Sequence, residues 1–464
     1  MPRLIIGNLF TDETAGDPRL LPAAYLQNAA LGAQMVLWFA KDSDVVLLPA
    51  MPEDAVLDYI TGMTGTDRST LRVVVPPPGV SGTGLLTADR LANKSFRDEL
   101  AAALDGVTVE NVFPMTPDAS VATLATDLGL EAALPGHAFF SQGGSVFVNS
   151  KAIFRTVAAG AGVPIPAGGV CTNQTDAHLA ISRLFDQGLP AMLKRDFSSG
   201  GFGNEVVSSV PGIEPVGAGR TVVLPDSAAI EAYLQERWDW LSVGGRYAVV
   251  VERYVQGSRA IFAEFQITDR GPVFLEQGAL YFAPVADAQV IPAPDLPRSA
   301  LTQLIASTVR LCEALHAVGY RGPISADAIL VPDGQVLFTE YNGRITGSTH
   351  AHAVIGNEIV GPNFGESVVV AEYIHWKVPS FQAAVQRLTE SSLAYDPATK
   401  SGVVLTKAPS PDGTVRYCAI AENLVGAAQL KDKVESLFTE ARPDSAIPAG
   451  LSGPDRHGPQ EEEA

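Results

Sequence analysis

The sequence predicts a protein of mixed α/β and α+β class, and three observations indicate this. Within residues 1–146, short apolar runs alternate with stretches of helical spacing, as in an open α/β domain with a parallel sheet. Farther on, strand-like runs follow one another through glycine-rich or turn-forming segments, as in α+β domains. The length of 464 residues allows two or three domains of roughly 150 residues each.

The cysteines and the apolar runs indicate a cytoplasmic protein. No apolar run approaches the roughly 20 residues of a membrane helix, and the first residues lack the pattern of a signal peptide. Cys171, Cys312 and Cys418 are widely spaced and odd in number, which favours reduced, buried thiols over a disulfide framework. We therefore expect no membrane partner.

The net charge of −19 argues against a general nucleic-acid binder, which needs a basic face. Such a charge favours a cationic substrate or partner, for example a peptide with basic residues or a guanidino group. The alternative is that the acidic surface mainly provides solubility.

The N-terminal domain contains five predicted strands separated by helices. Helices are expected over residues 94–104 and 119–128 because their apolar residues recur at helical spacing. No G-x-G-x-x-G follows the first strand, so a dinucleotide site of the usual type is not expected. The predicted strands are residues 4–7, 35–39, 45–48, 71–75 and 108–113.

A helix over residues 151–161 carries two cations on one face. Asn149 or Ser150 can cap its start, and Gly162 ends it. Lys151 and Arg155 stand four residues apart and repel each other unless an anion lies between them. A phosphate meets that need, although two solvated surface charges are the alternative.

A strand over residues 190–196 carries Lys194 and leads into a glycine-rich segment. Glycine at three of the four positions 200–203 allows backbone amides to approach a phosphate closely. Another strand follows, so we predict a hairpin lid, with a flexible hairpin turn as the alternative. The lid residues are Ser198, Ser199, Gly200, Gly201 and Gly203.

Glu252, Tyr254 and Val255 lie in a connector between two predicted lobes, where a nucleotide base can meet exposed backbone. A helix is predicted just before it, over residues 227–235, and a long amphipathic helix after it, over residues 297–318. The strands predicted around the connector are residues 248–252, 260–268, 272–277 and 280–283.

A hairpin formed by residues 324–331 and 336–342 places three oxygen-bearing side chains on one face. Side chains alternate along a strand, so Glu340 and Asn342 point the same way, and Asp327 joins them if the strands pair. Hard oxygen ligands of this kind suit Mg²⁺. Arg344 follows with a planar fork suited to phosphate or carboxylate. An ordinary polar surface hairpin is the alternative.

Beyond residue 349 the predicted elements form a smaller α+β unit. We expect helices over residues 367–375, 380–388 and 427–440. A hairpin is expected between residues 403–406 and 414–421, around the turn Ser410-Pro411-Asp412-Gly413. Residues 441–464 are rich in Pro, Gly and acids, so we expect them to be disordered.

Taken in order, these motifs resemble the ATP-grasp superfamily of carboxylate–amine ligases over roughly residues 1–360. Within that superfamily the chain is most similar to the peptide ligase of pheganomycin biosynthesis. The resemblance implies an ATP-grasp fold with an N-terminal α/β pre-grasp domain. Its expected divisions are 1–146 (pre-grasp), 147–255 (lid and A subdomain), 256–360 (C subdomain with the Mg²⁺ site), 361–440 (C-terminal α+β extension) and 441–464 (tail).

The resemblance also implies roles for single residues. Lys151 and Lys194 would hold ATP phosphates beneath the glycine lid, and Glu252 and Val255 would bind the adenine edge beside Tyr254. Asp327, Glu340 and Asn342 would carry two Mg²⁺ ions. Arg344 would stabilise the transferring phosphoryl group or the tetrahedral intermediate, with Lys194 and Arg155 as further catalytic cations. The ribose-binding glutamate usual after the connector is replaced by Ser258 and Arg259, and Glu264 is the expected substitute.

The implied reaction is peptide-bond formation through an acyl phosphate, releasing ADP and phosphate. It would join the carboxylate of a nonproteinogenic amino acid to the amino end of a peptide, in natural-product biosynthesis of the antibiotic kind. A homodimer is expected from the superfamily. Two alternatives are a small-molecule kinase of the same fold and a non-catalytic nucleotide-binding regulator.

Overall fold

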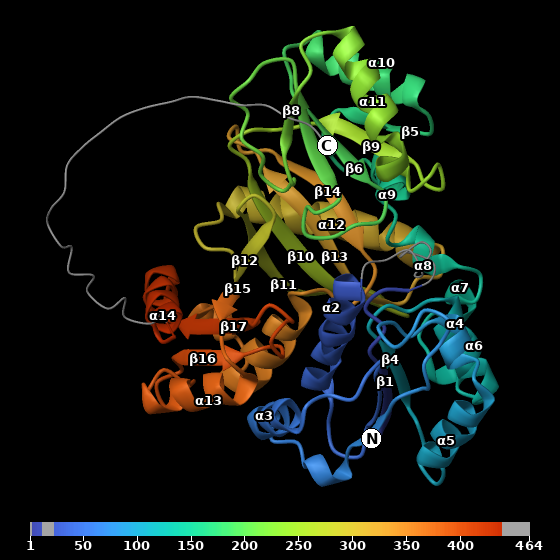
Figure 1. Ribbon diagram of the computed structural model, residues 1–464, viewed down its shortest axis with the longest axis vertical. Coiled ribbons are helices and arrows are strands. Elements are labelled where there is room, and N and C mark those ends of the chain that lie inside the picture. The colour runs from blue at the N-terminus through green and yellow to red at the C-terminus, as the bar shows by residue number, and fades with distance from the viewer. Residues whose placement is uncertain (1, 12–22, 439–464) are drawn as a thin grey trace, which may run out of the picture.

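The described part of the chain contains three β-sheets with helices packed against them (Figure 1). The computed structural model describes residues 2–11 and 23–438, so the predicted disordered segment 441–464 lies outside it. Within the described residues, no helix is both long and apolar enough to cross a membrane. The sheets contain four, five and eight strands.

The N-terminal sheet has the strand order β3-β2-β1-β4, and all its pairs are parallel, which confirms the predicted open α/β domain. Asn93 and Asp118 cap α5 and α6 by accepting from backbone N–H groups of the first turn. The strands are β1 (Arg3–Ile6), β2 (Val45–Leu47), β3 (Arg72–Val74) and β4 (Asn111–Pro114). The helices are α2 (Ala23–Ala33), η2 (Gln34–Phe39), α3 (Asp54–Thr64), η3 (Arg68–Thr70), α4 (Ala88–Leu91), α5 (Lys94–Leu104), α6 (Ala119–Asp127), η4 (Glu131–Ala133), α7 (His137–Phe140) and α8 (Gly144–Phe147).

The strand predicted at residues 35–39 is wrong, because this segment forms the 3-10 helix η2. Its apolar run is buried, and Trp38 and Val36 are fully enclosed. A short, continuously apolar run fits a buried strand and a buried helix equally well. Periodicity therefore could not separate the two.

The five-stranded sheet has the order β5-β9-β6-β7-β8 and lies within residues 147–255, the region predicted to hold the lid. Helices α10 and α11 cover it in the upper part of Figure 1, where their apolar side chains enclose a separate core. The strands are β5 (Gly168–Cys171), β6 (Ala191–Arg195), β7 (Asn204–Ser208), β8 (Thr221–Val223) and β9 (Val249–Arg253). The helices are α9 (Lys151–Gly160), α10 (Gln174–Phe185) and α11 (Ser227–Ser242).

The eight-stranded sheet has the order β14-β13-β10-β11-β12-β15-β17-β16, and its pairs are antiparallel. The apolar face of α12 packs on one side of it. The strands are β10 (Arg259–Thr268), β11 (Gly271–Phe282), β12 (Ala286–Ile291), β13 (Gly322–Leu330), β14 (Val336–Asn342), β15 (Val369–Lys377), β16 (Gly402–Leu405) and β17 (Thr414–Ala421). The helices are α12 (Arg298–Ala317), η5 (Ala351–Val360), η6 (Phe364–Glu366), α13 (Phe381–Glu390) and α14 (Leu424–Ser436).

Two further predictions in this part of the chain are wrong. Residues 367–375, expected as a helix, form most of β15, where Val369, Val370, Tyr373 and Ile374 suit a pleated strand. The two strands expected at residues 272–277 and 280–283 are one strand, β11, whose pairing shifts register opposite Glu264 and Phe265. A β-bulge shifts the pairing register by one residue without ending the strand, so the pattern of residues in the sequence is interrupted although the strand is not.

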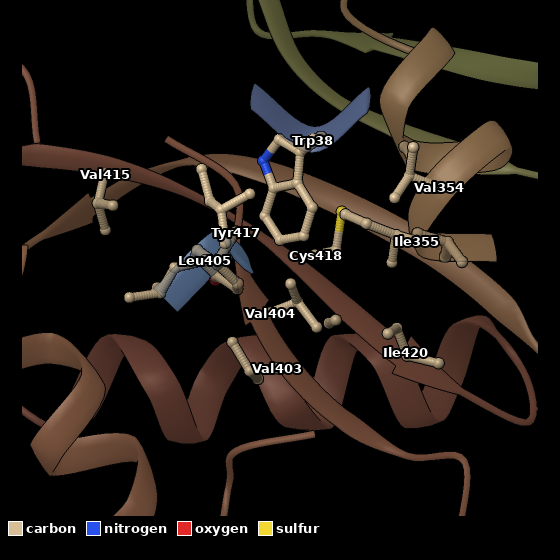
Figure 2. Packing of buried hydrophobic residues seen from close by; sticks show 14 of the residues in the cluster. Trp38, Val354, Ile355, Val403, Val404, Leu405, Val415, Tyr417, Cys418 and Ile420 are labelled. Atoms are coloured by element: carbon tan, nitrogen blue, oxygen red, sulfur yellow. The ribbon is translucent and has the colours of Figure 1, made fainter. Parts of the chain in front are cut away.

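Residues 361–440, expected as a separate extension, supply three strands to the eight-stranded sheet. The hairpin of β16 and β17 pairs as predicted. The core beneath it also contains residues of the N-terminal domain, and Figure 2 shows Trp38 among Val404, Leu405 and Cys418. The Trp38 indole N–H donates to the backbone oxygen of Thr406 at 2.9 Å. The first and last parts of the chain therefore share one core.

Candidate functional site

The hairpin of β13 and β14 forms, and it places Asp327 directly opposite Glu340. Asn342 stands opposite Ser325 one row along the same face. The Asn342 side-chain amide donates to Asp327 Oδ2 at 3.3 Å, and the Ser325 hydroxyl donates to Asp327 Oδ1 at 3.0 Å. The structure thus brings the three expected metal ligands together.

The two carboxylates of this hairpin have opposite electrostatic surroundings. Burial, followed by the nearby Glu340, raises the pKa of Asp327. Burial would also raise the pKa of Glu340, but Lys151 and Lys194 outweigh it and lower that pKa. The site therefore holds one firmly ionised carboxylate and a second one that needs another cation to ionise.

Lys151 reaches Glu340 from the start of α9. Its Nζ lies 3.0 Å from Glu340 Oε2 and donates to the backbone oxygen of Ser198 at 2.7 Å. The hydroxyl of Ser150 caps the helix by accepting from the N–H of Ile153, and it donates to Asp196 Oδ1 at 2.8 Å. The Lys151 ammonium group therefore joins α9 to two other segments. These are the loop between β6 and β7, called the lid loop below, and the β13–β14 hairpin, called the metal hairpin below.

Lys194 and Arg155 share the carboxylate of Glu252. Arg155 lies 2.7 Å from Glu252 Oε2, Lys194 forms an ion pair with Glu252 Oε1, and all three side chains are buried. Arg155 also donates to the backbone oxygen of Pro166 at 2.9 Å. The repulsion expected between Lys151 and Arg155 is thus relieved by two different carboxylates. The Glu252 side chain orients two cations, and its strand pairs with β5 on one side and β6 on the other, so adenine binding by Glu252 stays a prediction.

The lid loop between β6 and β7 closes over this group. Gly200 and Gly201 have φ values of 63° and 83°, which favour glycine. A side chain at Gly201 would approach the backbone of Gly217 to 2.8 Å. The backbone oxygen of Gly200 accepts from the N–H of Ala286 at 2.9 Å, and Ala286 begins β12 of the large sheet. The loop therefore bridges the two lobes, while Ser199 is exposed at its tip.

Tyr254 and Val255 form the connector immediately after β9. The hydroxyl of Tyr254 donates to the backbone oxygen of Glu214 and accepts from the N–H of Val216. The backbone oxygen of Val255 accepts from the hydroxyl of Ser258 at 2.9 Å. Tyr254 thus anchors the connector, and adenine binding by Val255 stays a prediction.

The structure speaks against Glu264 as the ribose ligand. Its carboxylate is buried and accepts from the hydroxyls of Thr346, Ser348 and Thr349. The Nε2 atom of His352 lies 2.9 Å from the same group. Four neighbours already satisfy both oxygens, so Glu264 fixes the 346–352 segment to β10. The ribose contact has no replacement among the predicted residues.

Arg344 lies beyond the metal hairpin and faces the same charges. Its guanidinium donates to Asn149 Oδ1 at 2.6 Å, and Glu340 and Asp327 oppose the lowering of its pKa by burial. Asn149 is therefore a partner of Arg344, while Ser150 is the cap of α9. An arginine held in this way can meet a phosphoryl group or a carboxylate.

The residues present fit Mg²⁺ by their donor chemistry. Two carboxylates and an amide oxygen are hard ligands. The raised pKa of Asp327 comes first from burial and then from the charge of Glu340, and a divalent ion would offset both. Among the described residues, no group of three or more His, Cys, Asp or Glu side chains is arranged to bind a metal. The number of ions stays a prediction.

Asp196 is a site residue that the sequence interpretation missed. Its carboxylate accepts from the Ser150 hydroxyl and from the N–H of Ala152, so it holds the start of α9 against β6. The sequence held one indication of its role: Asp196 lies two residues after Lys194, and alternation along a strand places such residues on the same face. The partner on α9 had no signal at sequence level, since it is 46 residues away.

Two family models match parts of the chain. The Pre ATP-grasp domain matches residues 33–130, and the PGM1 C-terminal domain matches residues 383–434. Among curated proteins, none matches the sequence.

Several solved structures share the fold at low sequence identity. An ADP complex of N5-carboxyaminoimidazole ribonucleotide synthetase is 13% identical with a TM-score of 0.56, covering 93% of this chain and 95% of that one. The enzyme of the same name from Thermus thermophilus is 16% identical with a TM-score of 0.55, covering 96% and 100%. The biotin carboxylase of Campylobacter jejuni is 14% identical with a TM-score of 0.54, covering 93% and 90%. The chain therefore has the ATP-grasp fold with an N-terminal pre-ATP-grasp domain.

Proposed function

We propose that this chain, which has the ATP-grasp fold, is an ATP-dependent carboxylate–amine ligase. The observation that carries the proposal is the meeting of Asp327, Glu340 and Lys151 beneath a glycine lid. Two opposed carboxylates beside a buried lysine suit a magnesium–phosphate complex. The resemblance of the solved structures, one of them an ADP complex, supports a nucleotide at this place.

Each group of the site has a separate task in this proposal. Asp327, Glu340 and Asn342 hold Mg²⁺, which offsets charge on the phosphates when bound. Lys151 and Lys194 exchange part of their contacts with Glu340 and Glu252 for phosphate oxygens. Arg344, held by Asn149, stabilises the transferring phosphoryl group. The lid loop excludes water.

The reaction balances without a covalent enzyme intermediate. A carboxylate oxygen of the acid attacks the γ-phosphorus of ATP, ADP leaves, and an acyl phosphate forms. The amine then attacks the acyl carbon and loses a proton. Phosphate leaves with an oxygen that began in the carboxylate, and an amide remains. The closed lid protects the acyl phosphate from hydrolysis.

The finer proposal is a peptide ligase of natural-product biosynthesis. Its acid would be a nonproteinogenic amino acid, and its amine the amino end of a peptide. The face of the large sheet that carries Glu340 continues towards β15 and β17 of the C-terminal segment. In this proposal, an extended acceptor lies along that continuation beside the hairpin of β13 and β14.

The test is an isotope-transfer assay on the full chain with ATP, Mg²⁺ and pools of amino acids and peptides. The acids carry ¹⁸O in their carboxylates, and mass spectrometry follows both the phosphate and the amide. We expect one ¹⁸O in the released phosphate for each amide formed, because the acyl phosphate passes its oxygen to phosphate.

The other outcomes separate the alternatives. A phosphorylated acid or alcohol that accumulates without amide would indicate the kinase. ATP binding without turnover in any pool would indicate the non-catalytic regulator. Glu390→Gln, which changes an exposed carboxylate on α13, is the matched control and should retain full turnover.

A further inference from the structure

Arg416 and Lys407 form a pair of half-buried cations that the site described above does not use. Arg416 lies on β17, and Lys407 follows β16 by two residues. Burial, and then the nearby Arg416, lower the pKa of Lys407 to about 8. Among the residues that the structure describes, neither side chain has a hydrogen-bond or ion-pair partner. The two cations therefore have carboxylates nearby, Glu372 and Asp412, but no direct contact with either among the described residues.

The nearest carboxylates are engaged elsewhere. Glu372 accepts from the Thr406 hydroxyl at 2.8 Å and from the Gln289 side-chain amide at 2.7 Å. His350 Nε2 lies 3.4 Å from the same carboxylate. Asp412, which also acts on Lys407, accepts from the hydroxyl and the N–H of Thr414. The donors of Arg416 and Lys407 are therefore left without a direct acceptor among the described residues, although both carboxylates lie nearby.

Gly347 lies beside Arg416, and its lack of a side chain leaves the guanidinium uncovered on that side. Gly347 is exposed, and the position its missing Cβ would take lies 3.9 Å from a guanidinium nitrogen of Arg416. Its backbone oxygen accepts from Gln289 at 2.8 Å, which fixes the glycine over the sheet. Gly347 follows the metal ligand Asn342 by five residues, so the two are at most roughly 18 Å apart. A peptide of a few residues spans that distance.

We propose that Arg416 and Lys407 bind the C-terminal carboxylate of the amine substrate, which is an amino acid or a short peptide. The inference rests on the proposed ligase function. The carboxylate of the acid substrate is consumed at the metal hairpin, so a second carboxylate belongs to the amine substrate. The arginine fork binds a carboxylate through two hydrogen bonds, and the lysine adds a second positive charge. The amine end of the same molecule then points back towards Arg344 and Glu340.

The test compares free and amidated peptides as ligands of the full chain. The probes are a pool of glycyl dipeptides, the same pool with C-terminal amides, and inorganic phosphate alone, each followed by thermal shift and calorimetry. We expect the free dipeptides to bind about tenfold or more tightly than the amides. Arg416→Gln should remove that preference, and Arg416→Lys should restore part of it.

The matched control is Arg387→Gln, which removes the same charge from the exposed face of α13 and should keep the preference. The melting temperature of Arg416→Gln is measured beside that of Arg387→Gln, because Arg416 attracts the buried carboxylate of Glu372 and its loss can lower stability without touching the site. Equal binding of free and amidated pools, binding of phosphate alone, or no binding at all would overturn the inference.

This binding test does not depend on turnover. Amide formation with amidated acceptors at full rate would leave the ligase proposal intact and reject the carboxylate site. Binding of free dipeptides without any turnover would support the carboxylate site and count against the ligase proposal.

Discussion

Two acidic clusters lie on the same face of the large sheet, and they differ in how their charge is satisfied. Glu264 receives four donors, from three hydroxyls and His352. Burial opposes ionisation of Glu264, but its neighbours, His352 first, lower the pKa below its ordinary value. Asp327 instead faces another carboxylate, Glu340, and its pKa is raised.

The difference separates a structural cluster from a binding cluster. A carboxylate whose oxygens are all satisfied by the chain has no capacity for a ligand and contributes to stability. A buried carboxyl group that faces another carboxylate and contacts no cation among the described residues, as Asp327 does, opposes folding in its ionised form until a cation arrives. Burial and acidity alone would have grouped Glu264 with the predicted metal ligands Asp327 and Glu340, and the hydrogen-bond partners distinguish Glu264 from them.

The largest expected effect is the loss of turnover in Glu340→Ala. The change removes the shared ligand and leaves the buried Lys151 without its carboxylate. We expect ATP turnover to fall by ~10³-fold or more, a loss of the size seen when charge stabilisation is removed from a site. ADP release measures it, with Glu390→Ala as the surface control. Near-normal turnover would remove Glu340 from the metal site.

Glu264→Gln should lower stability and leave the metal hairpin in place. In the unchanged protein, hydroxyls and His352 contact the carboxylate of Glu264. In the variant, an NH₂ group, which is itself a donor, replaces one carboxylate oxygen and cannot accept from them. We expect the free energy of unfolding to fall by about 3 kcal/mol, as for a broken buried charged cluster. Urea denaturation at neutral pH measures this. A stability equal to that of the unchanged protein would mean that the four contacts are not structural.

The contribution of Glu264 to stability should also depend on pH. The folded state lowers the pKa of Glu264, so its contribution is present above the unfolded pKa and is lost as pH falls through the folded one. The stability gap between the unchanged protein and Glu264→Gln should therefore narrow in acid. Unfolding measured from neutral pH downward tests this, and a gap that widens in acid would contradict it.

Asp327→Asn should stabilise the metal-free protein while it removes activity. The substitution removes a carboxyl group whose ionisation is opposed by burial and by the facing Glu340. We expect a gain of about 1–2 kcal/mol when a chelator is present, because an amide has no ionisation for the folded state to suppress. Mg²⁺ with ATP should raise the melting temperature of the unchanged protein only. A variant less stable than the unchanged protein under chelation would argue against a repulsive pair.

Thr349→Val gives the smallest expected change. It removes one of the hydroxyls that donate to Glu264, at 2.9 Å, and keeps the shape of the side chain. We expect a loss of about 1 kcal/mol in unfolding free energy with turnover retained. Loss of turnover together with unchanged stability would place the Glu264 cluster in the functional site instead.

The sequence was sufficient for the parts of the fold and site that depend on local order. The alternation along β14 placed Glu340 and Asn342 on one face, and the turn before it indicated pairing with Asp327. The phosphate-binding roles of Lys151, Lys194 and the glycine-rich loop came from the family resemblance and stay predictions. Three-dimensional partners could not be predicted, since Glu264 meets Thr346 and its neighbours 82 or more residues away. Residues 35–39 and 367–375 were misassigned because burial, and not periodicity, determines their conformation.

The contact between Trp38 and Thr406 has a consequence for how the protein is made. The two residues are 368 positions apart, yet they share one core with the β16–β17 hairpin (Figure 2). A ribosome releases the N-terminal part of that core long before the strands that cover it. Until then the apolar face stays exposed, which is the situation in which large proteins aggregate or need chaperones. For the same reason, we expect a fragment ending near residue 360 to aggregate rather than form a stable module.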